Sequence, residues 1–226
     1  MTVLFTLLSP AAGVSRDAFH DHWRHPHGTL GSRLSAVRSY VQNHRIRPAG
    51  LAVSDDRVEG VVRVELHHGS SAASIAEDPL YRDHLATDEA RFIDLETISP
   101  YVAETISLNP IRPATERAAD HDEDTDNLAD HLWSPFDAAS AATLLSLVAE
   151  EPTDCEDRAR EIGALWHGVY RVSGNTAEGD QTRFIEQFWW PTIGRCTDAL
   201  AGRRGPGLPD LAEGTRSVLA SCERLL

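Results

Sequence analysis

The order of hydrophobic patterns in the first 110 residues constrains the fold of this chain more than any other feature. Short apolar or alternating runs predict strands, and runs with helical periodicity predict helices. The predicted elements follow the order strand, helix, strand, strand, helix, strand, at residues 2–9, 15–34, 39–46, 60–68, 70–93 and 99–108. This order is typical of a ferredoxin-like unit, in which two helices cover one face of a four-stranded antiparallel sheet.

The second half of the chain repeats the same order less clearly. Its predicted elements lie at residues 141–150, 153–168, 169–174, 182–190, 192–202 and 216–226. The repetition indicates an internal duplication. Between the halves, residues 113–131 hold seven acidic residues and a single Arg, which is typical of a solvated linker. We therefore expect one unit over residues 1–112, an acidic linker over 113–138, and a second, degenerate unit over 139–226.

The duplication also predicts how the two units pack. A ferredoxin-like sheet carries helices on one face, so its other face must be buried against something. The second unit can supply that cover within the same chain. The sequence thus predicts an α+β protein with two βαββαβ units packed sheet to sheet as an eight-stranded, barrel-like core. A monomer satisfies both sheets, and a homodimer is equally compatible.

Composition excludes several classes of function. The net charge of −14 makes nucleic acid a poor partner, and the absence of Lys excludes Schiff-base catalysis. No run of about 18 apolar residues is present, so we expect no membrane-spanning helix, and we interpret the apolar N-terminus as a strand. The three Cys residues are far apart and form no CxxC pair, so neither a thiolate zinc site nor a disulfide framework is expected. These features favour a cytoplasmic protein.

The segment FHDHWRHPHGTL, residues 19–30, raises the question of a metal site. Phe19 and Trp23 fall on one helical stripe, with His27 beside it. A metal would need three His side chains on one face, and helical geometry supplies at most two. We therefore expect no metal here and look for another role for these residues.

Four motifs in a fixed order carry a family resemblance. They are FHDHW…H (Phe19, Trp23, His27), YVQNH (Tyr40–His44), Gly60 in VEGVV, and DEARFID (Asp88–Asp94). Together, between about residues 3 and 107, they resemble the EthD-like family of dimeric α+β barrel proteins. Typical members are about half as long and build the barrel from two chains, so this chain resembles a fused version. Its second half lacks the W-x-x-x-H and DE-x-R-F motifs, which suggests one active cavity per chain.

The resemblance implies a limited set of activities. The family and its relatives include isomerases of the muconolactone type, cyclases acting on polyketides, and members with no known activity. The related isomerases use a His on the first helix and a Tyr at the start of the second strand, positions that match His27 and Tyr40. They also use a Cys on the third strand, which the first half lacks, and Arg63 stands where the family has an acid. Both departures argue against simple lactone isomerisation.

Tyr40, Gln42 and His44 share one strand face by the two-residue period. If that face lines a cavity, it offers groups for proton transfer and for binding an enolate oxygen. The alternative is that the face packs under the helix with its polar ends paired. We predict His27, His44 and Tyr40 as catalytic residues.

Four further residues are predicted to bind the substrate: Trp23, Gln42, Arg63 and Phe19. For Trp23 a place in the core is the stronger alternative. For Arg63 it is an internal salt bridge with Glu65. The charged residues Asp88, Glu89 and Arg91 are interpreted as structural, with surface ion pairs that contribute little.

These features predict an enzyme that performs cofactor-independent proton transfer, as isomerisation, cyclisation or elimination, on an apolar cyclic, lactone or polyketide-type substrate. No nucleotide-binding loop is present, and no cofactor is expected. One alternative is a non-catalytic carrier of a small molecule. Another is a haem-dependent or cofactor-free oxygenase, because fused α+β barrels can also house haem.

Overall fold

A computed structural model describes the chain at residues 1–49, 57–111, 134–136, 140–175, 179–201 and 216–225. The predicted acidic linker falls almost entirely outside these residues. Within them, no helix is long and apolar enough to cross a membrane.

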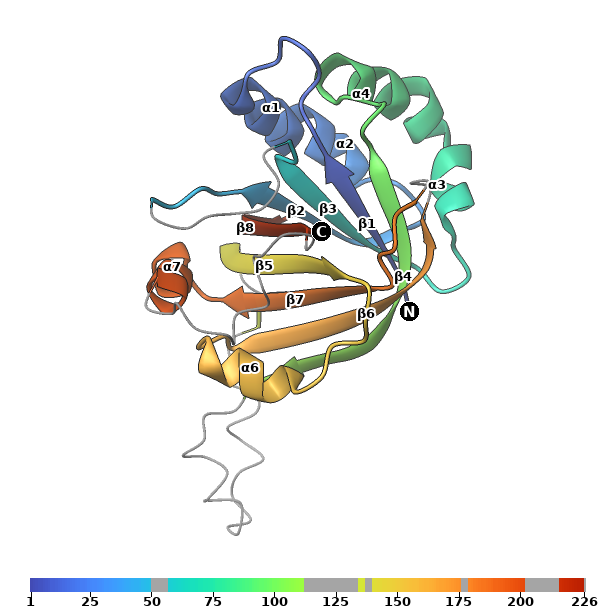
Figure 1. The fold of residues 1–226 in the computed structure, drawn as a ribbon. Coiled ribbons are helices and arrows are strands. Elements are labelled where there is room, and N and C mark those ends of the chain that lie inside the picture. Colours follow the sequence, from blue (N-terminus) through green and yellow to red (C-terminus); the bar gives the residue numbers. More distant parts are fainter. Residues whose placement is uncertain (50–56, 112–133, 137–139, 176–178, 202–215, 226) are drawn as a thin grey trace.

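The described strands close into one eight-stranded barrel (Figure 1). They are β1 (Thr2–Leu8), β2 (Val37–Arg45), β3 (Gly60–Leu66), β4 (Ser99–Pro110), β5 (Ser140–Val148), β6 (Trp166–Asn175), β7 (Phe184–Trp190) and β8 (Arg216–Arg224). Their order around the barrel is β1-β3-β2-β8-β5-β7-β6-β4, and every neighbouring pair is antiparallel. The first four strands are contiguous, as are the last four, and the halves meet at β2–β8 and β4–β6. The predicted mixed fold with an eight-stranded, barrel-like core is confirmed.

The helices lie on the outside of the barrel, each group over its own half (Figure 1). The first half carries α1 (Arg16–His22), η1 (Trp23–His27), α2 (Gly28–Gly31), α3 (Ala72–Glu77), η2 (Tyr81–Leu85) and α4 (Ala86–Phe92); the second carries α6 (Cys155–Glu161) and α7 (Ile193–Ala201). Each strand of the first half therefore has one face toward the barrel interior and one toward these helices.

Successive residues of each strand face alternately toward the barrel interior and toward the helices, and the inward-facing ones form the interior core. Along β1, Val3, Phe5 and Leu7 face the interior and are buried there. Phe5 meets Tyr170 of the other half edge to face, with ring centroids 4.9 Å apart. Full burial of a large apolar side chain stabilises a fold by about 1.5–3 kcal/mol, so this interior is a packed core that joins the two halves.

The two predicted helices of the first half are each interrupted. Ser15 caps α1 as predicted, accepting a hydrogen bond from the Ala18 amide at 3.2 Å. Pro26 then lies inside η1, a π-helical turn. Proline has no amide hydrogen and clashes with the carbonyl four residues earlier, and a wider turn relieves that clash. The second predicted helix is interrupted at Asp78, which is extended before Pro79.

One predicted boundary in the second half is wrong. The helix expected over 153–168 ends at Glu161, and Trp166 already belongs to β6. Gly163 adopts a φ of +61°, the left-handed conformation in which helices commonly terminate. Glycine at that position stops the helix before the aromatic residues that the pattern assigned to it.

Candidate active site

A cavity of about 300 Å³ lies between the outer face of the first-half strands and the helices that cover them. Its walls are mainly apolar and include Leu4, Leu34, Val64 and Leu85. Polar side chains reach it from η1, β2, η2 and α4. Apolar walls with a few convergent polar groups are the usual form of a small-molecule site.

His27 forms one polar end of this cavity. It is 6% exposed, and its Nδ1 lies 3.0 Å from Oδ2 of Asp88, whose Oδ1 lies 2.9 Å from Nε2 of His22. Because a carboxylate only accepts hydrogen bonds, this contact places the proton of neutral His27 on Nδ1. Nε2 is then the basic nitrogen, and it lies 4.0 Å from Oε1 of Glu89.

Glu89 lines the cavity beside His27 and is held by Tyr81, whose hydroxyl donates to Oε2 at 2.9 Å. Burial raises the pKa of Glu89, and the charge of Asp88 adds to that rise. Burial lowers the pKa of His27, and the hydrogen bond that His27 donates to Asp88 partly offsets this effect. The two pKa values thus move toward each other.

Tyr40 and Trp23 also line the cavity. Burial raises the pKa of Tyr40 to about 12, so its phenol stays protonated at neutral pH. The indole Nε1 of Trp23 is fully buried and makes no hydrogen bond of ordinary geometry within the described residues, although the Tyr40 hydroxyl lies close enough to interact electrostatically with it.

Two glycines let the aromatic residues approach the sheet. A Cβ on Gly31 would lie 3.0 Å from the Tyr40 ring, and one on Gly60 would lie 2.2 Å from Cζ3 of Trp23. The second contact is impossible without movement. Gly60, one of the residues that carry the family resemblance, is therefore required by the position of Trp23.

Tyr40, Gln42 and His44 lie on one strand face, and of these three only Tyr40 lines the cavity. Gln42 donates to the backbone oxygen of Trp23 at 2.7 Å and lies 3.0 Å from Nε2 of His44. The His44 ring packs 4.5 Å from that of Trp23, and burial holds the pKa of His44 well below its usual range. Gln42 and His44 thus support Trp23 from behind.

The remaining predicted residues lie outside the cavity. Phe19 is fully buried against Trp23 and Phe92, with ring centroids 5.6 Å from each. Arg63 faces the barrel interior, is 1% exposed and donates to Glu65 at 2.6 Å. The internal salt bridge that the sequence offered as the alternative for Arg63 is therefore the one present.

Sequence reasoning missed three residues of this site: Tyr81, Asp88 and Glu89. Asp88 and Glu89 were interpreted as surface charges, yet both contact the His27 region. One signal was available, because Asp88 precedes the buried Phe92 by four residues and therefore shares its helix face. The contact itself joins positions 61 residues apart, so local spacing could not reveal it.

A family model describes this half of the chain. The model of the EthD domain matches residues 11–96, which include His27, Tyr40, Tyr81 and Glu89 of the cavity. Over residues 11–96 the chain is therefore similar to the EthD domain. A comparison with curated proteins finds no match for the chain.

Solved structures extend the likeness of fold beyond the EthD domain. A protein described as anthrone oxidase-like aligns with a TM-score of 0.55 at 7% identity, over 99% of this chain and 92% of its own. A chlorite dismutase mutant from Candidatus Nitrospira defluvii aligns with a TM-score of 0.46 at 9% identity, over 98% and 91%. A DyP-type peroxidase from Cellulomonas bogoriensis aligns with a TM-score of 0.47 at 12% identity, over 98% and 89%. At these identities the first likeness concerns the fold alone, and the other two are too weak to support an argument.

Proposed function

We propose that the EthD-like region, residues 11–96, binds a small, largely apolar cyclic molecule and moves a proton on it without a cofactor. The reaction class is isomerisation, cyclisation or elimination next to a carbonyl, on a lactone or polyketide-type substrate. One observation carries this proposal: Nε2 of His27 and Oε1 of Glu89 lie 4.0 Å apart on the wall of an apolar cavity. Between them, a base and an acid with converging pKa values can reach one small molecule.

Each group has a stated part in the transfer. His27 accepts a proton from the carbon next to the carbonyl at Nε2, while Asp88 keeps the ring in the required tautomer. Tyr40 donates a hydrogen bond to the enolate oxygen that forms. Glu89 in its protonated form, or the His27 imidazolium, returns a proton to another carbon or to the leaving group. After each turnover, proton exchange with solvent returns His27 and Glu89 to their starting protonation states, so the protein gains or loses no proton overall.

The cavity volume limits the substrate. A cavity of about 300 Å³ lies at the small end of ligand pockets, and one of roughly 150 Å³ already holds a benzene ring. This comparison favours a molecule of one or two rings. The mostly apolar lining favours a substrate with one carbonyl or phenolic oxygen to face the polar end.

We further propose that residues 1–112 and 139–226 are two ferredoxin-like units and that the chain is a dimer-like barrel formed in cis. This is supported by the strand order, since β4-β1-β3-β2 and β8-β5-β7-β6 are the same sequence of positions within each half. In this arrangement the second half of the chain closes the barrel, and the protein is a monomer or a homodimer of such chains.

The test of function is proton exchange, because it needs no knowledge of the natural substrate. Cyclic ketones and lactones are incubated with the full chain in deuterated water, and exchange of the carbon-bound proton is followed by NMR. We expect exchange by the wild type and a loss of about 10²–10⁴-fold in His27→Gln, the range for a lost general base. His25→Gln is the matched control, because His25 lies in the same segment with a 68% exposed side chain.

Three outcomes would overturn the proposal. Proton exchange at the wild-type rate in His27→Gln would show that His27 is not the base. Tight ligand binding without exchange in the wild type would favour a carrier. A haem absorption band, or oxygen consumption with substrate, would favour an oxygenase.

A further inference from the structure

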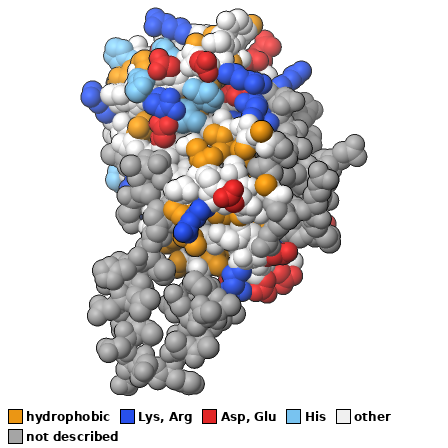
Figure 2. All heavy atoms as spheres, turned by 90° about the vertical axis from the view of Figure 1, so that its left-hand side faces the viewer, with side chains coloured by type: hydrophobic (Ala, Val, Ile, Leu, Met, Phe, Trp, Pro, Cys, Tyr) orange, Lys and Arg blue, Asp and Glu red, His pale blue; other side chains and the backbone are white. Residues whose placement is uncertain are grey.

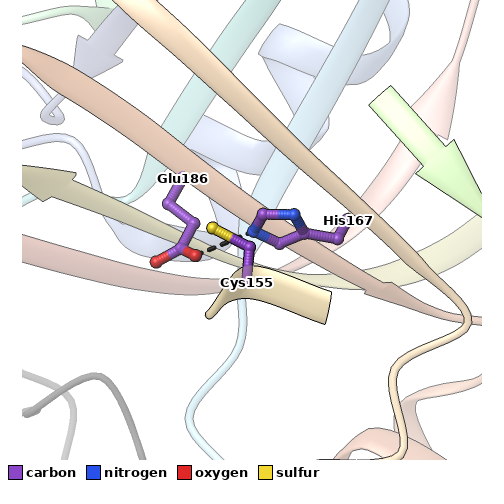
Figure 3. Close-up of side chains that lie close together, drawn as sticks. All are labelled: Cys155, His167 and Glu186. Carbon is purple, nitrogen blue, oxygen red and sulfur yellow. Dashed lines mark hydrogen bonds and ion pairs between the residues drawn. The ribbon is translucent and has the colours of Figure 1, made fainter. Parts of the chain in front are cut away.

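The second half brings three potential metal ligands together from three elements (Figure 3). Cys155 is the first residue of α6, His167 lies on β6 and Glu186 on β7. One ligand atom of each lies within 4.8 Å of the other two. His167 and Glu186 are 4% and 1% exposed, whereas Cys155 is partly accessible. This cluster lies over the other half of the barrel and shares no residue with the EthD-like region.

The donor set suits zinc. Thiolate sulfur, imidazole nitrogen and carboxylate oxygen are the three ligand types that Zn²⁺ takes in proteins. With metal–ligand bonds of about 2.0–2.3 Å, tetrahedral ligands stand roughly 3.3–3.8 Å apart. The cluster is therefore within about 1 Å of the spacing required, and rotation about side-chain bonds can supply the difference.

A guanidinium currently neutralises the buried carboxylate. Oε1 of Glu186 accepts from Nη2 of Arg158, and it lies 2.8 Å from Nε2 of His167. The Cys155 thiol donates to the oxygen of Pro152 at 3.3 Å. Burial raises the pKa of Cys155 to about 11, and the charge of Glu186 adds to the rise. Without a metal, the cluster is thus a thiol, an imidazole and a carboxylate paired with Arg158.

We propose that Cys155, His167 and Glu186 form a three-ligand site for a zinc-type divalent ion, with a fourth position open to water. On binding, the Cys155 thiol loses its proton to solvent and the sulfur binds the metal. The proton of neutral His167 moves from Nε2, where it faces Glu186, to Nδ1, so that Nε2 can bind the ion. Thiolate and carboxylate then balance the two charges of the ion. Arg158, which is 26% exposed, turns from Glu186 toward solvent. The site ties α6 to β6 and β7.

The experiment uses the full chain, stripped with a chelator and then titrated with Zn²⁺ or Co²⁺. We expect one zinc per chain by elemental mass spectrometry, and a thiolate-to-cobalt charge-transfer band. Cys155→Ala should lose the band and bind zinc at least tenfold more weakly. Cys196→Ala is the matched control, because Cys196 packs in the apolar core beneath α7 and lies outside the cluster.

Arg158 gives a second, opposite test that does not depend on losing a ligand. Arg158→Gln removes the competing cation, so zinc should bind at least tenfold more tightly and should restore the thermal stability that the variant loses without metal. A purely structural cluster would leave Arg158→Gln unstable at any zinc concentration. That result would overturn the proposal. Equal zinc uptake by wild type and Cys155→Ala would also overturn it, because the ion would then lie elsewhere, for example at the exposed His25 of η1.

Discussion

Replacing Gly60 by Ala tests the packing that positions the cavity wall. The new Cβ would lie 2.2 Å from Cζ3 and 2.6 Å from Cη2 of Trp23. Carbon atoms pack at about 3.5–4.0 Å, so the indole must move by roughly 1.3 Å. Trp23 is fully buried, and its free side is the cavity itself. We therefore expect the indole to shift into the cavity, which weakens both the fold and ligand binding.

The magnitude follows from two opposing terms. Overpacking of this kind costs about 1–3 kcal/mol, and this contact is severe enough for the upper value. Loss of backbone freedom in the unfolded chain returns about 0.4–1 kcal/mol. The free energy of unfolding should thus fall by about 2 kcal/mol, which lowers Tm by roughly 4–8 °C in a chain of this length.

The assay is urea unfolding followed by Trp fluorescence and circular dichroism. Gly174→Ala is the matched control, because it also lies on a strand and its nearest neighbour would be Cβ of Val102 at 4.0 Å. That variant should be as stable as the wild type or slightly more so. In Gly60→Ala/Trp23→Phe the smaller ring relieves the clash, so the double variant should be more stable than the sum of single effects predicts, by more than 1 kcal/mol. Strictly additive effects, or a Gly60→Ala variant as stable as Gly174→Ala, would refute the reasoning.

Three further predictions concern the site and its counterpart in the second half. Burial lowers the pKa of His27 below its usual value of 6.5, so the rise of kcat/KM with pH should lie below 6.5. Asp88→Asn removes a charge that raises this pKa and should move the rise to lower pH. Ala76 is exposed and lines the cavity, so Ala76→Leu should weaken ligand binding at least tenfold by calorimetry while changing the free energy of unfolding by no more than about 0.5 kcal/mol. Trp190 donates a hydrogen bond to the buried backbone oxygen of Ile162 at 3.1 Å. Trp190→Phe should lower the free energy of unfolding, measured in urea, by about 1–3 kcal/mol and leave ligand binding in the cavity unchanged.

Local patterns predicted the strands because each strand obeys a period of two over its own length. The pattern expected a strand over 60–68, and β3 spans Gly60–Leu66. The same rule placed Tyr40, Gln42 and His44 on one face, but it could not tell which of them reaches a cavity. That depends on the helix above, where η1 lays Trp23 over Gln42 and His44 and leaves only Tyr40 of the three at the cavity.

Contacts between segments that lie far apart in the chain could not be predicted from local sequence patterns. The pairing of His27 with Asp88 needs the two helical segments to lie side by side over one sheet, and no local period encodes that. The cluster of Cys155, His167 and Glu186 is of the same kind, because it joins one helix and two strands. The expectation that no thiolate zinc site exists rested on CxxC spacing, which detects only ligands that are neighbours in the chain.

The interior of the barrel carries different residues at comparable positions of its two halves. Arg63 lies opposite Phe5 at the middle of β3, and its guanidinium stacks over the rings of Phe136 and of Tyr170 in β6, 5.3 and 5.5 Å from their centroids. The comparable central position on β7, opposite Leu145, is the neutral Gln187. In a symmetric barrel of two identical chains, the same residue would stand at both positions. Two guanidinium groups would then share one buried interior, at a desolvation cost of several kcal/mol each. Within one chain the two positions can differ, so the first half carries the charge and Tyr170 of the second half supplies one of the aromatic faces that hold it.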